Sequence, residues 1–291
     1  MTQHEASVAS AALLDLARDI ALRASEFTIE ARRAGVSVAA TKSTHTDIVT
    51  AVDRDTETLI RSFILDARPD DGIVGEEGVT HVGTSGVDWV VDPIDGTVNF
   101  LYGIPAWAVS IAVVEGAGGA RDADGARGGG AGLEAGLGGT TLAGVVVNPV
   151  TGELFEASAG GGARLTGREL VVNPAVSLGS ALVGTGFSYA AERRREQADV
   201  LLELLPKVRD IRRIGSAALD LCALAAGRLD AFYERGLNAW DHAAGALVAR
   251  EAGALVGGPG GGSENGELLV AAAPGLYEEL TAALREAGVD A

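Results

Sequence analysis

Residues 89–100, which read WVVDPIDGTVNF, are the most informative stretch of this sequence. The apolar residues at its start predict a buried strand that delivers the carboxylate of Asp92 at its end. A proline then bends the chain, and Asp95 follows three residues after Asp92. Two carboxylates on one turn can bind a divalent cation or bridge two, and the amides of Gly96 and Thr97 can bind phosphate. Asp-Pro and Asp-Gly are also ordinary turn pairs, so the stretch alone leaves a plain turn open.

Two other acidic motifs flank this stretch at a distance. Glu76 and Glu77 lie between Gly75 and Gly78, shortly after the apolar pair at positions 73 and 74. This pattern indicates a strand end that directs the acids toward a binding partner. Asp241 opens an apolar helix in residues 240–245, WDHAAG, whose small side chains would let another backbone approach closely. Taken separately, the first motif can be a solvated acidic pair and the second a favourable charge in the first turn of a helix.

Together, Glu76-Glu77, residues 92–97 (DPIDGT) and residues 240–245 (WDHAAG) resemble the signature of the inositol monophosphatase family. This superfamily of Mg²⁺-dependent, lithium-sensitive phosphatases also includes fructose bisphosphatases and bisphosphate nucleotidases. The order and spacing of the three motifs fit over residues 8–287, and their combination is much more specific than any one of them.

The resemblance implies a set of metal ligands and catalytic groups. Two or three Mg²⁺ ions would be bound by Glu76, Asp92, the carbonyl of Ile94, Asp95 and Asp241, with Asp92 bridging two of them. Thr97, hydrogen-bonded to Asp47, would help Glu76 activate the attacking water.

The same resemblance implies the substrate contacts. The amides of Gly96 and Thr97 would bind the phosphate and Glu234 would bind the ring hydroxyls. Asp95, Ala217 and Lys42 would complete the substrate contacts. The leading function is therefore hydrolysis of myo-inositol monophosphate by metal-activated water, in a cytoplasmic homodimer. Histidinol phosphate, fructose bisphosphate and an adenosine bisphosphate remain alternative substrates, and a metal-bound interaction or regulatory protein remains an alternative of another class.

The composition agrees with Mg²⁺-dependent chemistry and argues against several other partners and metal sites. The net charge of −17 gives no background attraction for nucleic acid or for an anionic membrane, and we expect neither as a partner. Carboxylates and water are the ligands that Mg²⁺ prefers. Cys222, the only cysteine, excludes an internal disulfide and a cysteine-based zinc site, and we expect it in the core. No stretch resembles a signal peptide or a transmembrane helix, which favours a soluble, cytoplasmic protein.

The pattern of apolar residues predicts an α+β or mixed α/β protein, and the resemblance implies a layered αβαβα sandwich. We expect an N-terminal half, 1–175, that carries most metal ligands, and a C-terminal half, 176–291, that carries Asp241 and the substrate contacts. Predicted helices span 8–34, 53–66, 192–205, 216–226, 241–252 and 276–287, and predicted strands span 89–91, 108–114, 142–147, 153–157, 181–185, 229–233 and 268–272. Glycine-rich residues 116–144 and 257–266 are predicted loops.

Overall fold

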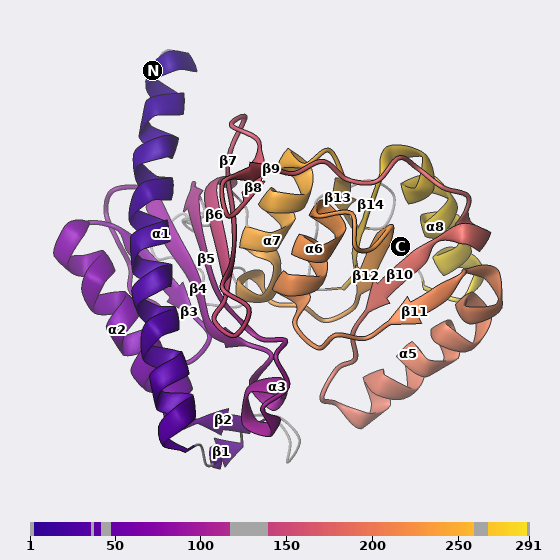
Figure 1. Ribbon diagram of the computed structural model, residues 1–291, viewed down its shortest axis with the longest axis horizontal. Coiled ribbons are helices and arrows are strands. Elements are labelled where there is room, and N and C mark those ends of the chain that lie inside the picture. The colour runs from indigo at the N-terminus through magenta and orange to yellow at the C-terminus, as the bar shows by residue number, and fades with distance from the viewer. Residues whose placement is uncertain (1–2, 36–37, 42–47, 117–138, 259–266, 290–291) are drawn as a thin grey trace, which may run out of the picture.

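The structure, a computed structural model, describes residues 3–35, 38–41, 48–116, 139–258 and 267–289 (Figure 1). Its helices are α1 (Gln3–Ala34), α2 (Ala51–Ala67), α3 (Thr97–Tyr102), α5 (Ala191–Leu204), α6 (Ala217–Ala225), α7 (Ala239–Glu251) and α8 (Pro274–Glu286). Its strands are β1 (Val38–Thr41), β2 (Ile48–Thr50), β3 (Gly72–Gly75), β4 (Val87–Asp95), β5 (Ala108–Glu115), β6 (Thr140–Asn148), β7 (Glu153–Ser158), β8 (Ala163–Leu165), β9 (Arg168–Glu169), β10 (Leu182–Thr185), β11 (Asp210–Arg212), β12 (Ala231–Glu234), β13 (Leu255–Gly257) and β14 (Leu269–Ala272).

The strands form two large sheets. Strands β3 to β9 make a seven-stranded sheet in chain order, so each strand pairs with its sequence neighbour. All of these pairs are antiparallel except β3 and β4, which are parallel. The second sheet has the order β11-β10-β12-β14-β13 and mixes both directions. Strands β1 and β2 form a separate antiparallel pair.

Helices cover both sheets and separate them. Because side chains alternate between the two faces of a strand, each face of the seven-stranded sheet builds its own core. One face packs against α1 and α2, around Trp89 and Ile111, and the other packs against α6 and α7, around Val90 and Ala112. Helices α6 and α7 also cover one face of the second sheet, whose far face packs against α5 and α8. The layers run helix, sheet, helix, sheet, helix, which confirms the predicted fold class (Figure 1).

Helix α7 lies unusually close to its neighbours, as its small residues predicted. A Cβ atom on Gly144 of β6 would lie 2.9 Å from the carbonyl oxygen of Ala244, so that position of β6 has no room for a side chain. On the opposite side, a Cβ atom on Gly245 would lie 3.0 Å from the carbonyl oxygen of Ala218 in α6. Cys222 is fully buried in the core of these layers, also as predicted.

Other details differ from the sequence predictions. Helix α2 begins earlier than predicted, because Thr50 is its N-cap and Asp53 is the acidic partner three residues later in a capping box. The predicted loop 116–144 ends earlier, since β6 already begins at Thr140, and residues 117–138 lie outside the described residues. Gly257 belongs to β13, and 259–266 also lie outside the described residues. The division into halves at 175/176 stays a prediction. In the described part of the chain, no helix is long and apolar enough to cross a bilayer.

Candidate functional site

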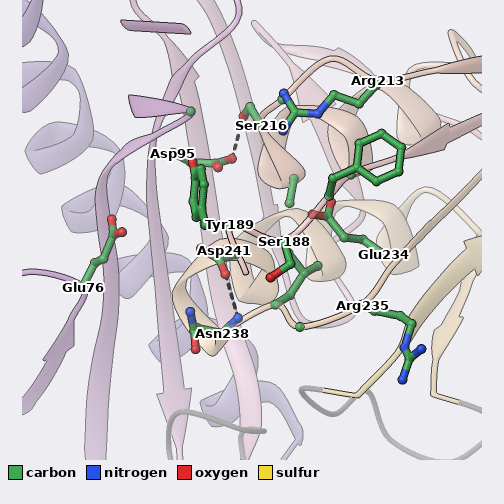
Figure 2. A pocket seen from close by; sticks show the side chains of 17 residues that line it. Glu76, Asp95, Ser188, Tyr189, Arg213, Ser216, Glu234, Arg235, Asn238 and Asp241 are labelled. Carbon is green, nitrogen blue, oxygen red and sulfur yellow. Dashed lines mark hydrogen bonds between the residues drawn. The ribbon is translucent and has the colours of Figure 1, made fainter. Parts of the chain in front are cut away.

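Six of the predicted site residues line one pocket. They are Glu76, Asp95, Gly96, Ala217, Glu234 and Asp241, and the pocket has a volume of about 170 Å³. Figure 2 shows Glu76 on one side of this pocket, Glu234 on the other, and Asp95 and Asp241 between them. These side chains come from the loop after β3, the end of β4, the end of β12 and the first turn of α7. The pocket therefore lies where both sheets and a helix of the middle layer meet.

The turn at the end of β4 is held by its own polar groups. Pairing between β4 and β5 is irregular between Asp92 and Asp95, where the proline lies. Within the turn, Oδ1 of Asp92 accepts a hydrogen bond from the amide of Ile94 at 2.9 Å. Asp92, Ile94 and Thr97 are all buried in this turn and are not among the residues that line the pocket. The Asp-Pro and Asp-Gly pairs thus form an ordinary turn, and the same turn carries the candidate site residues.

Gly96 allows this turn to meet the second half of the chain. Its φ of 96° lies in the left-handed region that favours glycine. A Cβ atom here would lie 3.0 Å from the carbonyl oxygen of Gly215, in the loop that precedes α6. A side chain would therefore separate Asp95 from that loop.

Asp95 receives hydrogen bonds from the beginning of α6. The hydroxyl of Ser216 donates to Oδ2 of Asp95 at 2.5 Å, and the amide of Ala218 donates to the same oxygen at 2.8 Å. Burial raises the pKa of Asp95 to about 6, while these hydrogen bonds and the charge of Arg213 oppose the rise. The carboxylate is thus oriented by one set of donors and poorly solvated.

Asp241 is the third residue of α7. Its Oδ2 accepts a hydrogen bond from the amide of Asn238 at 2.6 Å and so caps the helix. The pKa of Asp241 lies well above the ordinary value, because the carboxyl is buried and because the charges of Glu76 and Asp95 disfavour a further negative charge. Asp241 thus both caps α7 and lines the pocket, so the two interpretations of this acid are compatible.

Glu234 lies over the end of β10. A Cβ atom on Gly186 would lie 2.1 Å from Oε1 of Glu234, so this glycine makes room for the carboxyl group. A Cβ atom on Gly184, two residues earlier, would lie 2.8 Å from Leu229 and 3.2 Å from Oδ1 of Asp220. Burial, followed by the charges of Asp220 and Asp95, raises the pKa of Glu234 to about 8.

Sequence reasoning missed three groups around this pocket. Asp220 in α6 is buried, its Oδ1 has no hydrogen-bond partner among the described residues, and burial followed by the charge of Asp95 raises its pKa to about 8. Arg213 lines the pocket and opposes the raised pKa values of Asp95, Asp220 and Glu234. Ser216 was expected only as the first residue of the predicted helix 216–226. The one available sequence signal was the pair of glycines at 184 and 186, at the end of β10, which leave space for acidic side chains.

Thr97 contacts a carboxylate that had not been predicted as its partner. Its hydroxyl lies 3.2 Å from Oδ1 of Asp53 and 3.1 Å from the carbonyl oxygen of Ile94, and it can donate to either. Asp47, the expected partner, and Lys42 lie outside the described residues. Asp53 was expected only as the first residue of the predicted helix 53–66, although it lies on the buried face of that helix.

The donor set fits a hard divalent cation. Carboxylates from four separate segments line the pocket, and the negative charges of Glu76 and Asp95 raise the pKa of Asp241, so a cation would relieve their repulsion. His242 is buried in α7 and does not line the pocket. Among the described residues, no group of three or more His, Cys, Asp or Glu side chains is gathered so as to hold an ion as it stands. The fit therefore rests on donor chemistry and on the shared pocket.

Comparison with known proteins gives a consistent result. A model of the inositol monophosphatase family matches residues 9–120 and 135–288. The chain is 47% identical over 274 residues to inositol-1-monophosphatase SuhB of Mycobacterium tuberculosis, covering 90% of this chain and 87% of that protein. It is 35% identical over 280 residues to Nus factor SuhB of Vibrio cholerae, covering 95% and 97% of the two chains. The crystal structure of extragenic suppressor protein suhB from Bartonella henselae matches with a TM-score of 0.81 and 32% identity, covering 94% of this chain and 99% of that one.

Proposed function

The chain belongs to the inositol monophosphatase family and is a phosphatase of phosphate monoesters, and from that premise we propose that it hydrolyses myo-inositol monophosphate with Mg²⁺. The single observation that carries the proposal is the pocket in which Glu76, Asp95 and Asp241 face Glu234. The first three acids suit metal ions, which would bind the phosphate, and the fourth suits a polyhydroxylated leaving group. The names of the more similar relatives support the same substrate.

Five groups would hold two or three Mg²⁺ ions: Glu76, Asp92, the Ile94 carbonyl, Asp95 and Asp241. When bound, the ions neutralise phosphate charge, lower the pKa of a water molecule and stabilise the leaving alkoxide. The chain's own residues prepare this arrangement. Ser216 and the amide of Ala218 orient Asp95, and the amide of Asn238 orients Asp241. These carboxylates must be ionised to bind cations, so the donors that oppose their raised pKa values favour loading.

Proton transfer from the attacking water is assigned to Glu76 and Thr97. With its hydrogen directed to Oδ1 of Asp53, the oxygen of Thr97 keeps lone pairs that can accept a hydrogen bond from water. In this proposal Asp53 supports Thr97, and Asp47, for which the same role was predicted, lies outside the described residues. The carboxylate of Glu76 accepts the proton that the water releases.

The remaining contacts orient the ester. The amides of Gly96 and Thr97, which follow Asp95 in the chain, would bind the phosphate, and Ala217 lines the same pocket as Asp95 and Gly96. Glu234, when ionised, accepts hydrogen bonds from ring hydroxyls. Lys42 stays a predicted contact outside the described residues.

A panel of phosphate esters tests the substrate. Phosphate release is measured from inositol 1-phosphate, histidinol phosphate, fructose 1,6-bisphosphate and adenosine 3′,5′-bisphosphate. The highest kcat/KM with inositol 1-phosphate supports the proposal. A higher kcat/KM with another ester would keep the phosphatase and reject the inositol assignment.

A second function is favoured by one observation, namely that some relatives are called Nus factor SuhB. A metal-bound regulatory protein would keep its partner when catalysis is removed. Asp92→Asn, which removes a proposed metal ligand, separates the two functions. A partner retained by this inactive variant supports a regulatory role, and a partner lost with the metal argues against an independent one.

The resemblance also favours a cytoplasmic homodimer. Light scattering during size exclusion would then give about twice the 29.5 kDa of one chain. A mass near that of one chain would reject the dimer.

A further inference from the structure

The carboxylate of Glu57 in α2 binds the backbone of the loop that carries Glu76. Its Oε2 accepts a hydrogen bond from the amide of Glu77 at 2.7 Å, and its Oε1 accepts one from the amide of Gly78 at 2.9 Å. Only 2% of Glu57 is exposed. Hydrogen bonds from backbone amides to a buried carboxylate are charge-assisted and geometrically strict.

Together with the sheet, Glu57 fixes three consecutive amides of this loop. The amide of Glu76 itself donates to the carbonyl oxygen of Val91 in β4, at 3.3 Å. Val91 directly precedes Asp92, so this bond ties Glu76 to the strand that carries the other acids. The next two amides donate to Glu57. The backbone is therefore held on both sides of the Glu76 side chain.

The two glycines of the GEEG motif are explained by the same carboxylate. A Cβ atom on Gly75 would lie 2.3 Å from Oε1 of Glu57, and one on Gly78 would lie 2.6 Å from it. Neither position has a positive φ, so space and not backbone conformation requires glycine here. Residues 75–78 therefore leave the space that the carboxylate of Glu57 in α2 occupies.

Glu57 is charge-balanced and shares its helix face with Asp53. Nε of Arg61, one turn further along α2, donates to Oε1 of Glu57 at 2.7 Å. Asp53 lies one turn earlier on the same buried face and contacts Thr97. Residues four apart lie on one side of a helix, so α2 presents two carboxylates to two different segments of the site.

We propose that Glu57 is a positioning residue that holds Glu76 in the orientation needed to bind metal. The proposal deepens the proposed function and rests on it, because Glu57 only positions Glu76, and Glu76 is a metal ligand only in the proposed function. Glu57 touches neither substrate nor metal in this account. Loss of its hydrogen bonds lets the loop move, and Glu76 then spends less of its time beside Asp95 and Asp241. Metal affinity falls, while a saturating concentration of Mg²⁺ restores most of the turnover.

Two variants test this by different routes. Glu57→Gln keeps the shape of the side chain but loses its charge and one of its two acceptors. Gly78→Ala keeps both charged side chains, Glu57 and Arg61, and adds one methyl group that would lie 2.6 Å from Oε1 of Glu57, so the carboxylate must move away from the loop. Asp55→Asn is the matched charge control, since Asp55 is an exposed acid on the same helix. Gly179→Ala is the matched methyl control, because the nearest atom to its Cβ lies at 3.9 Å.

Metal affinity is measured without turnover, by electron paramagnetic resonance of Mn²⁺ bound to the full chain, and with turnover, from the Mg²⁺ dependence of kcat. For both test variants we expect the metal concentration at half-saturation to rise about 10–100-fold, with kcat at saturating Mg²⁺ and KM for the ester close to wild type. Both controls keep wild-type values. Folded variants that keep the wild-type Mn²⁺ and Mg²⁺ midpoints would overturn the proposal. Should Glu57→Gln fail to fold, Gly78→Ala decides, because it removes no charge from the buried Glu57 and Arg61.

Hydrogen exchange separates this proposal from the proposed function. The amides of Glu77 and Gly78 lose protection in Glu57→Gln if Glu57 holds the loop, whether or not the protein is a phosphatase. A wild-type chain without phosphatase activity or Mn²⁺ binding would refute the proposed function. Unchanged exchange at these two amides would refute the role of Glu57.

Discussion

Ser216 donates its hydroxyl to Oδ2 of Asp95 at 2.5 Å, which joins the first turn of α6 to the end of β4 across 121 positions of the chain. The same hydroxyl accepts a hydrogen bond from the amide of Leu219 and so caps α6. One side chain thus both starts a helix of the middle layer and orients an acid of the pocket.

Ser216→Ala should therefore weaken metal binding at low pH. Without this donor the pKa of Asp95 rises above about 6, so the acid limb of the pH–activity profile moves to higher pH. Loss of the cap also lowers the free energy of unfolding by about 0.5–2 kcal/mol. Ser62→Ala, at an exposed serine of α2, is the control. An acid limb that stays in place in Ser216→Ala would show that the bond does not influence Asp95.

Asp53→Asn and Asp47→Asn together test which carboxylate supports Thr97. Because Thr97 contacts Asp53, we expect Asp53→Asn to lower kcat about 10–100-fold with little change in KM, and Asp47→Asn to have a smaller effect. Steady-state kinetics at saturating Mg²⁺ measures both. A larger loss of kcat in Asp47→Asn would return the role to Asp47. Circular dichroism controls for the capping bonds that Asp53 makes with Thr50.

Asp241→Asn should weaken metal binding and activity while the fold remains intact. The asparagine oxygen can still accept from the amide of Asn238, so the start of α7 survives. The Mg²⁺ concentration at half-maximal activity should rise by more than the roughly 10–100-fold that follows loss of a neighbouring hydrogen bond. Mn²⁺ binding and thermal unfolding in EDTA are measured side by side. Wild-type turnover at ordinary Mg²⁺ concentrations would sink the assignment of Asp241 as a ligand.

Asp220 should make the metal-free protein less stable as pH rises. Its pKa is about 8 in the folded chain and about 4 in the unfolded one. Between these values the folded state binds more protons, so the free energy of unfolding falls with increasing pH. The penalty is absent below about pH 4 and complete above about pH 8. Asp220→Asn cannot ionise and should flatten this part of the dependence.

The measurement is the unfolding midpoint in EDTA between pH 5 and pH 9, for wild type and Asp220→Asn. A difference of 1 kcal/mol corresponds to about 2–4 °C in chains of 150–250 residues. Glu234 and Asp95 add to the wild-type slope, since their pKa values are also raised. Parallel curves for the two proteins would mean that Asp220 is not the buried acid described here.

The layered fold was accessible from the sequence because its long elements have regular patterns. The amphipathic helices α1, α2 and α8 and the apolar strands β4 to β7 were all predicted close to their observed places. The short strands β8, β9, β11 and β13 were missed. Two or three residues cannot show an alternating pattern, and only the neighbouring strand makes them extended.

The site was accessible where an acid follows a strand or opens a helix, as for Asp95 and Asp241. The groups that orient these acids were not. Asp53 was only the first residue of the predicted helix 53–66, Glu57 was not singled out, and their partners lie 44 and about 20 positions away. Nothing local in the sequence identifies a carboxylate as the partner of a distant amide, although the two glycines of residues 75–78 marked the space that Glu57 fills.

The most direct test of the account is phosphate release from inositol 1-phosphate by the wild-type chain in Mg²⁺, in EDTA, and in EDTA followed by excess Mg²⁺. The account predicts release in Mg²⁺, none in EDTA, and recovery when Mg²⁺ is restored. Release that persists unchanged in EDTA would contradict the metal-assisted mechanism. No release in any condition, from a folded chain, would contradict the assignment as an inositol-phosphate phosphatase.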